Sequence, residues 1–310
     1  MTHASVKYER MLSDLRMDLR PQREWGEGRG LFLVIGHFVV GIAAGAWLFA
    51  LIFDRPAALV AAFALAALGG LAHLGFLGKP DRFWRMSMRA RTSWISRGFI
   101  GLSLFLAGAA LYLAPQYLPG TPWGSESLLA DAGYAMALVG MVVLMGYMGF
   151  VYTSAKAIPF WNSPLHPALY VAYALRGGVA ALFVTALADG GAGELPAVLL
   201  PLWGGITVLV ALFFMLEIHG ALTSGNEAAR RSVHDLLAGR VAVYFYGGTL
   251  VLGLFVPAYL MYTGLTGPLS AGAMALLGVS SAIGDFFMKY ATIRAGVRLP
   301  VWTHLTPQRR

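Results

Sequence analysis

Eight runs of mostly apolar residues follow one another along this chain of 310 residues. They cover roughly residues 31–53, 57–77, 97–115, 130–155, 167–188, 196–219, 241–263 and 269–293. A helix needs about 20 apolar residues to cross the hydrocarbon core of a bilayer, and each run has about that length. Only 12% of the residues are charged, against about 25% in soluble domains, which excludes a water-soluble fold. The pattern predicts an all-α integral membrane protein with eight transmembrane helices.

The apolar runs leave room for one membrane domain and two polar ends. We expect residues 1–30 to form a cytoplasmic N-terminal segment, residues 31–293 the eight-helix membrane domain, and residues 294–310 a cytoplasmic tail. The N-terminal segment has no short apolar core followed by a small-residue cleavage site, so it does not resemble a secretory signal peptide. Insertion is then expected to depend on the helices themselves.

Basic residues gather at alternate ends of the predicted helices. Of the 23 Lys and Arg residues, 21 lie on the side that includes both termini, and the exceptions are Arg55 and Arg176. The positive-inside rule therefore places both termini in the cytoplasm. This topology signal also accounts for the net charge of +8, because the basic residues segregate by alternate loops and do not form one soluble face. No nucleic-acid partner is expected.

Cysteine is absent from the sequence. Iron–sulfur clusters need thiolate ligands, and covalently attached c-type haem needs a pair of cysteines. The chain is therefore predicted to hold no iron–sulfur cluster, no c-type haem and no disulfide. We also expect no other metal site within it.

Ionisable residues inside the predicted spans are few, and each is a functional candidate because a charge in lipid is costly. Arg176, Glu217, Asp285 and Lys289 are candidates for a proton path. Asp285 and Lys289 are four residues apart, a spacing that favours a self-neutralised pair on one helical face. Glu217 has no partner in its own sequence neighbourhood, which makes it the better relay candidate or a residue that reaches the membrane interface.

A second group of polar residues is predicted to share one layer toward the cytoplasmic side. From the helical rise, His37 lies about 10 Å inside the membrane, Tyr147 about 12 Å and Tyr152 about 6 Å. Quinone needs an apolar pocket with a donor at each carbonyl, and a His and a Tyr on facing helices can supply them. His73 and Arg97 complete the candidate pocket, although His37 and His73 are also consistent with structural hydrogen bonds between helices.

Two connecting segments carry more basic and aromatic residues than a short loop requires. They are His73 to Gly98 and Ile158 to Pro167. Trp and Arg anchor membrane proteins at the interface, which explains part of this composition. The remainder indicates a docking surface for another protein. The candidate docking residues are Lys79, Arg82, Trp84, Arg85, Arg89, Trp161 and Asn162.

Four motifs give the chain a resemblance to a known family. They read PQREWGEG from Pro21, HLGFLGKPDRFW from His73, TSWISRG from Thr92 and IPFWNSP from Ile158. With eight helices around them, these motifs resemble the polysulfide reductase membrane-anchor family, the NrfD/PsrC-like proteins. The variant is most similar to anchors of phenylacetyl-CoA:acceptor, sulfite and dimethyl-sulfoxide-type molybdoenzyme complexes.

The resemblance implies a haem-free membrane anchor that exchanges electrons and protons between a docked iron–sulfur subunit and membrane quinone, menaquinone or ubiquinone. The implied partners are a ferredoxin-like iron–sulfur subunit and a molybdenum or tungsten pterin subunit that transforms the primary substrate. An N-terminal four-helix bundle would carry the quinone site, with four further helices beside it. The family's helix 1 His and helix 4 Tyr map onto His37 and onto Tyr147 or Tyr152. The implied location is the cytoplasmic (inner) membrane of a bacterium or archaeon, with a cytoplasmic partner.

Two other functions remain open from the residues alone. His37, His73 and His219 lie toward one membrane face, which is also compatible with a haem b electron-transfer subunit. Arg176, Glu217 and the Asp285/Lys289 pair are compatible with an ion- or solute-translocating subunit. Transporters of that kind often carry paired interrupted helices at the midplane, and the sequence shows no such pair.

Overall fold

A computed structural model of the chain describes residue 9, residues 19–188 and residues 195–299. Within these ranges, eight helices are long and apolar enough to cross a membrane, so the predicted all-α membrane fold is confirmed. Each predicted boundary lies within four residues of the observed one. The predicted polar ends, residues 1–30 and 294–310, fall partly outside the described residues.

In chain order the spans are α2 (Gly30–Ile52), α3 (Pro56–Phe76), α4 (Trp94–Tyr117), α5 (Leu128–Thr153), α6 (His166–Thr185), α7 (Leu195–Thr223), a seventh span made of η2 (Tyr244–Phe255) and α9 (Val256–Thr266), and α10 (Ala271–Ala295). Four short elements lie between or beyond them: β1 (Arg20–Pro21), η1 (Pro80–Arg89), α8 (Glu227–Leu237) and β2 (Val297–Arg298). The helices η1 and α8 were not predicted, because both are short and polar.

Several spans begin at residues that stabilise a helix N-terminus. The side chains of Ser93, Ser127 and Ser270 accept hydrogen bonds from backbone amides three residues on, which satisfies donors that have no partner inside the helix. Pro56 occupies the first turn of α3, where the missing amide hydrogen is not needed. These local signals set where the spans start.

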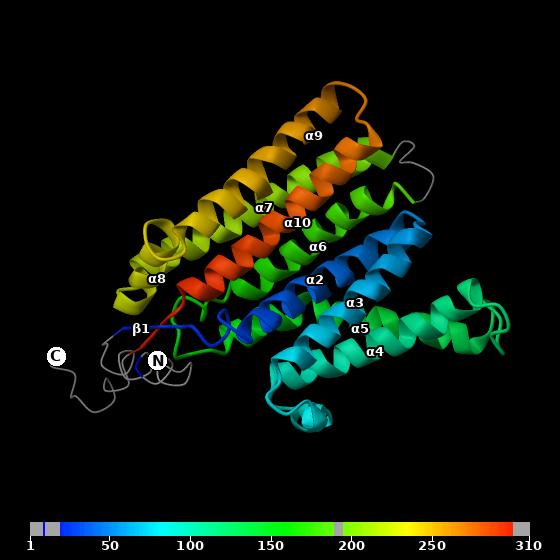
Figure 1. Ribbon diagram of the computed structural model, residues 1–310, viewed down its shortest axis with the longest axis horizontal. Helices are drawn as coiled ribbons and strands as arrows, with labels where there is room; N and C mark the ends of the chain where they lie inside the picture. Colours follow the sequence, from blue (N-terminus) through cyan, green and yellow to red (C-terminus); the bar gives the residue numbers. More distant parts are fainter. Residues whose placement is uncertain (1–8, 10–18, 189–194, 300–310) are drawn as a thin grey trace.

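Helix α6 lies at the centre of the molecule and contacts α2, α5, α7 and α10 (Figure 1). Small residues permit the closest approaches: a Cβ at Gly45 of α2 would collide with the α6 backbone at Ala174, and Gly253 of η2 meets Gly284 of α10 backbone to backbone. In lipid, such close packing replaces the hydrophobic effect as the force that associates helices. The four N-terminal spans also contact one another, and α6 joins them to the C-terminal spans.

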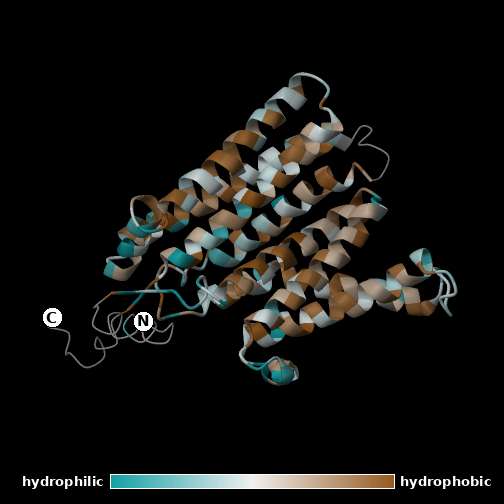
Figure 2. Ribbon diagram, viewed as in Figure 1, coloured by the Kyte–Doolittle hydropathy of each residue, from teal (hydrophilic) through white to brown (hydrophobic). Residues whose placement is uncertain are grey.

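Hydrophobic residues cover the sides of the spans, and hydrophilic residues gather at the helix ends, in η1 and in α8 (Figure 2). Large apolar side chains such as Leu71 at 63% and Val208 at 69% exposure point outward. A water-soluble protein rarely exposes so large an apolar surface, whereas a bilayer requires it.

The seventh span contains a π-helix, η2, which the sequence analysis did not predict. Its wider turns hydrogen-bond five residues apart, and such segments occur most often at functional sites. The carbonyl of Gly253 in η2 accepts a hydrogen bond from Nη2 of Arg176 at 2.5 Å. The π-helix thus supplies a backbone acceptor to a guanidinium group buried between helices.

The two ends of the described chain meet in a small clasp. Strands β1 and β2 pair antiparallel, with Arg20 opposite Arg298 and Pro21 opposite Val297. The Val297 amide donates to Ser232 of α8 at 3.0 Å, so α8 is tied to the same structure. This clasp joins the segment before the first span to the segment after the last one.

Candidate functional site

His37 and Tyr152 form a buried hydrogen-bonded pair between α2 and α5. Nδ1 of His37 lies 3.2 Å from the Tyr152 hydroxyl oxygen, and the two side chains are 6% and 1% exposed. Which group donates depends on the imidazole tautomer. The predicted layer of His and Tyr therefore exists, and its members are in direct contact.

His73 lies next to this pair. Its ring centroid is 5.0 Å from that of His37, and its Nδ1 is 2.7 Å from the Gly69 carbonyl oxygen. Since that carbonyl only accepts, Nδ1 is the donor, and Nε2 has no hydrogen-bond partner among the described residues. Gly36 makes the approach possible, because a Cβ there would lie 2.6 Å from Nδ1 of His73.

Tyr147 lies on the other side of His37, with ring centroids 6.4 Å apart in a T-shaped arrangement. Its ring packs directly on Gly98, the last residue of the TSWISRG motif, where a Cβ would collide with it. Gly98 of α4 thereby fixes how closely Tyr147 of α5 can approach. The two candidate tyrosines occupy different places, since only Tyr152 is hydrogen-bonded to His37.

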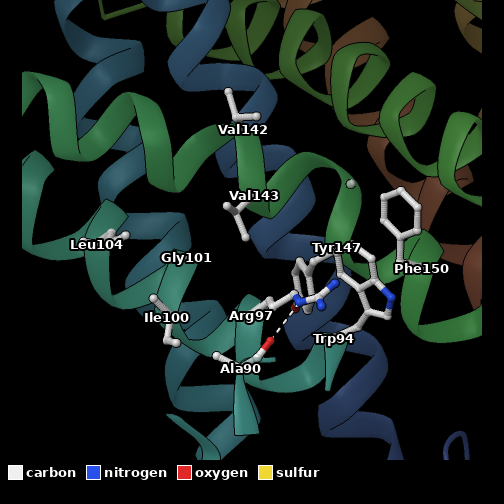
Figure 3. Close-up of a pocket in the computed structure, with 11 residues that line it drawn as sticks. Ala90, Trp94, Arg97, Ile100, Gly101, Leu104, Val142, Val143, Tyr147 and Phe150 are labelled. Carbon is white, nitrogen blue, oxygen red and sulfur yellow. Dashed lines mark hydrogen bonds between the residues drawn. The ribbon is translucent and has the colours of Figure 1, made fainter. Parts of the chain in front are cut away.

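A pocket of about 390 Å³ lies between α4 and α5, and Tyr147 forms part of its wall (Figure 3). Its lining consists of Ala90, Trp94, Arg97, Ile100, Gly101, Leu104, Val142, Val143, Gly146, Tyr147 and Phe150. Trp94 and Phe150 stack with centroids 4.1 Å apart, and the Arg97 guanidinium lies over Trp94 at 4.1 Å. Arg97 and Tyr147 lie at one end, and the surface of the pocket is almost entirely apolar. His37 does not line the pocket; the Tyr147 ring adjoins both.

An aromatic wall closes the opposite side of Tyr152. The rings of Trp161 and Tyr170 lie 5.0 and 5.3 Å from it, and Trp25, just before α2, lies 5.7 Å away. Tyr152 and Tyr170 are hydrogen-bonded through their side chains. The IPFWNSP and PQREWGEG motifs therefore meet at this site, although they are far apart in the sequence.

A buried contact between a histidine and a carboxylate, which the sequence pattern did not reveal, continues from Tyr170. His166 is 0% and Glu217 4% exposed, and Nδ1 of His166 lies 2.5 Å from Oε1 of Glu217. His166 also stacks on Tyr170, with centroids 5.7 Å apart. The spacing of 166, 170 and 173 places these residues on one face of α6, which was a usable signal. Glu217 therefore has a partner in α6 and is buried between helices.

The expected pair of Asp285 with Lys289 is wrong. Asp285 pairs with Arg176 of α6, which also donates to Thr207 at 2.9 Å and lies over the Trp203 ring at 4.9 Å. Among the described residues, no carboxylate lies within ion-pair distance of Lys289. Its ammonium faces aromatic rings of Phe38, Tyr170 and Tyr173 at 5.3 to 5.8 Å. Arg176, which lies on another helix and makes further hydrogen bonds, is therefore the partner of Asp285.

The candidate docking residues divide into two groups. Lys79, Arg82, Trp84, Arg85 and Arg89 lie in or next to η1, in which no residue is buried. Trp161 instead is 1% exposed and donates its indole N–H to the Thr292 carbonyl at 3.2 Å. Asn162 is exposed, and its amide donates to the Thr153 carbonyl. Trp161 therefore stabilises the interior, and η1 presents the exposed basic surface.

No metal-binding group is found among the described residues. His219 lies on an exposed face of α7, away from the buried His37. His37 and His73 face each other too closely, at 5.0 Å between centroids, to bind the two sides of one haem iron. The geometry gives no support to bis-His haem ligation by these three residues.

Comparison with known proteins identifies relatives of this chain. The sequence model of a family described as "Polysulphide reductase, NrfD" matches residues 28–300. The chain is 28% identical over 307 residues to Protein NrfD of Escherichia coli, an alignment that covers 84% of this chain and 93% of the relative. It is 24% identical over 273 residues to the C chain of polysulfide reductase from Wolinella succinogenes, covering 76% and 86%. A Protein NrfD homolog of Haemophilus influenzae is 22% identical over 307 residues, covering 85% and 92%.

Proposed function

The chain belongs to the polysulphide reductase NrfD family, and on that premise we propose that it is the quinone-reactive, haem-free membrane subunit of an oxidoreductase complex. The family makes it a membrane subunit of a redox complex. In our proposal it exchanges electrons and protons between a docked iron–sulfur subunit and menaquinone or ubiquinone. A separate molybdenum or tungsten pterin subunit would transform the primary substrate, so this chain acts in the quinone half-reaction alone.

One observation carries the proposal: a largely apolar pocket ends at Tyr147, whose ring lies 6.4 Å from that of a His37 already hydrogen-bonded to Tyr152. Quinone sites combine an apolar cavity with a few placed donors. Quinone-coupled turnover of His37 and Tyr147 variants, compared with turnover to a soluble acceptor, tests the proposal.

The residues suggest distinct roles. A quinone carbonyl that gains electron density needs a hydrogen-bond donor and then a proton. Tyr147 lines the pocket, and in our proposal its hydroxyl donates to one carbonyl. His37 lies behind it, and its contact with Tyr152 allows the imidazole to be reprotonated from within the protein. His73 adjoins His37, and Arg97 holds Trp94 at the mouth of the pocket.

Protons need a route that avoids lipid, and the buried polar chain offers one. Tyr152 bonds to Tyr170, which stacks on His166, which binds Glu217. Arg176, Asp285 and Lys289 continue the polar interior through α10. We propose these groups as the proton path, with His166 and Tyr170 added to the candidates found from the sequence.

We propose that the partner subunits bind the cytoplasmic face of the inner membrane and that both termini lie there. The exposed cations of η1, with 21 of 23 basic residues on the side of the termini, support this orientation. The absence of haem is checked by an absorption spectrum of the complex, because a reducible Soret band assigned to this chain would contradict it.

Reversing the charge of η1 should release the iron–sulfur partner. We expect Arg82→Glu, Arg85→Glu and Arg89→Glu together to lower co-purification of the partner at least tenfold, since complementary charge orients such contacts. Quantitative immunoblotting of the purified chain measures the ratio. The matched control reverses Arg230 and Arg231, an exposed basic pair in α8.

A fluorescent reporter fused after Arg310 guards against a change of topology in these variants, because removing basic residues can reorient a membrane protein. It should fluoresce in the wild type and in both variants. Full co-purification of the partner in the triple variant would show that η1 is not the docking surface. Alkaline phosphatase can be fused after Arg310 in a second wild-type version. If that enzyme were active and the fluorescent reporter dark, the proposed cytoplasmic location of the C-terminus would be wrong.

A further inference from the structure

The pocket between α4 and α5 is open toward the outside of the helical bundle. Val142 is 64% and Phe150 37% exposed, and both line it. These positions face lipid in a membrane-spanning chain. The pocket is thus a groove in the lipid-facing seam of two helices, and Figure 3 shows its apolar side chains on one side and Arg97, Trp94 and Tyr147 at the other.

The groove has the shape of a site for an extended apolar tail. Its lining on α4 extends from Trp94 to Leu104, which is about 15 Å of helix, or roughly half of the hydrocarbon core. Gly146 leaves the floor of the groove open, because a Cβ there would meet only Phe150 at 3.7 Å and Val171 at 3.9 Å. The volume of about 390 Å³ is within the usual range of ligand pockets.

We propose that this groove binds the isoprenoid tail of the quinone and admits the ring from the lipid toward Tyr147 and His37. The inference rests on the proposed quinone function and specifies where the substrate enters. The groove adjoins the His37 site, which supports the proposal: Tyr147 lines the groove and also lies edge-on to His37, with 6.4 Å between ring centroids. The ring of a bound quinone would then lie at the end of the groove next to Tyr147, and its tail would lie along the rest of the groove.

A phospholipid is the competing occupant, with its phosphate at Arg97. The structure disfavours it, because the Arg97 guanidinium is already engaged. Nε donates to the Ala90 carbonyl at 2.9 Å and Nη2 to the Arg91 carbonyl at 3.0 Å, while the group lies over Trp94. Arg97 therefore holds Trp94 in the wall of the groove, and it has few N–H groups left to donate to a phosphate.

Gly146→Leu tests the inference by filling the groove. In the purified complex, KM for menaquinone-4 should rise about tenfold, whereas KM for menadione, which has the same ring without a tail, should stay within about twofold. Each is offered as quinone and as quinol. Gly205→Leu is the matched control, because Gly205 is an exposed helical glycine of α7, and a Cβ placed on it would have no atom within 4 Å. Equal effects on both substrates, or none on either, would overturn the proposal.

A binding measurement that needs no turnover keeps the two proposals distinguishable. Menaquinone carrying a diazirine on its tail should label peptides of α4 or α5 in the wild-type complex and lose that labelling in Gly146→Leu. Labelling elsewhere, or competition by phospholipid but not by unlabelled menaquinone-4, would show that the groove holds lipid. A complex that binds the tail here but exchanges no electrons with either quinone would refute the proposed function and not the tail site.

Discussion

The complex with His37→Ala is expected to lose quinone-coupled turnover by at least about 100-fold, while turnover with a soluble artificial acceptor persists. A group that donates and returns protons contributes roughly 10² to 10⁴ in rate, and His37 is the buried imidazole that contacts Tyr152 directly. The soluble acceptor takes electrons from the partner subunits and bypasses this chain. The ratio of the two activities in one preparation is therefore the measurement.

The tyrosines separate the roles that the structure suggests. Tyr147→Phe removes a hydroxyl at the pocket and should raise KM for quinone, whereas Tyr152→Phe removes the partner of His37 and should lower kcat. His219→Ala is the matched control, since this histidine is exposed on α7.

Full quinone activity in an assembled His37→Ala complex would show that the quinone reaction takes place elsewhere. The surroundings of Arg176, Glu217 and Asp285 would then be searched next.

Arg176→Met is expected to destabilise the membrane domain strongly, by about 3–5 kcal/mol, because it leaves the buried Asp285 carboxylate without its partner. It also removes the donors to Thr207 and to the Gly253 carbonyl. Asp285→Leu should destabilise to a similar degree for the converse reason. The double variant Arg176→Met/Asp285→Leu should recover part of the loss, since it leaves neither member of this pair buried without the other.

Thermal unfolding of the detergent-solubilised complex, followed as the fraction of soluble monodisperse protein against temperature, measures this effect. Arg91→Met serves as the control, because Arg91 is an exposed arginine. Additive losses in the double variant, or a single variant as stable as the wild type, would show that the Arg176–Asp285 contact contributes little to the fold.

The sequence was sufficient for the spans because a transmembrane helix is encoded locally. Apolar length and the polar residues at each end identify it without reference to any other part of the chain. The predicted runs therefore agree with the observed helices at every span. The π-helix η2 was not predictable in this way, because apolar length does not record how many residues each turn contains.

Which buried polar side chains pair with each other depends on contacts between helices, and the sequence was less informative about these pairs. The spacing of Asp285 and Lys289 favoured a pair on one helix, but Arg176 on α6 reaches Asp285 instead. Trp161 belongs to a loop that looked exposed, yet it is buried against α10. His37 and Tyr152 were correctly expected to share one layer, because helical rise alone determines depth.

The clasp of β1 with β2 has a consequence for how the protein is made. Residues 297 and 298 follow the last span, so this pairing forms only after the ribosome has delivered all eight spans. Before the last span is made, Trp161 also lacks the Thr292 carbonyl that accepts its indole hydrogen bond. The aromatic wall is thus finished last, and an incompletely synthesised or proteolysed chain that keeps every predicted quinone ligand would still lack its closing side.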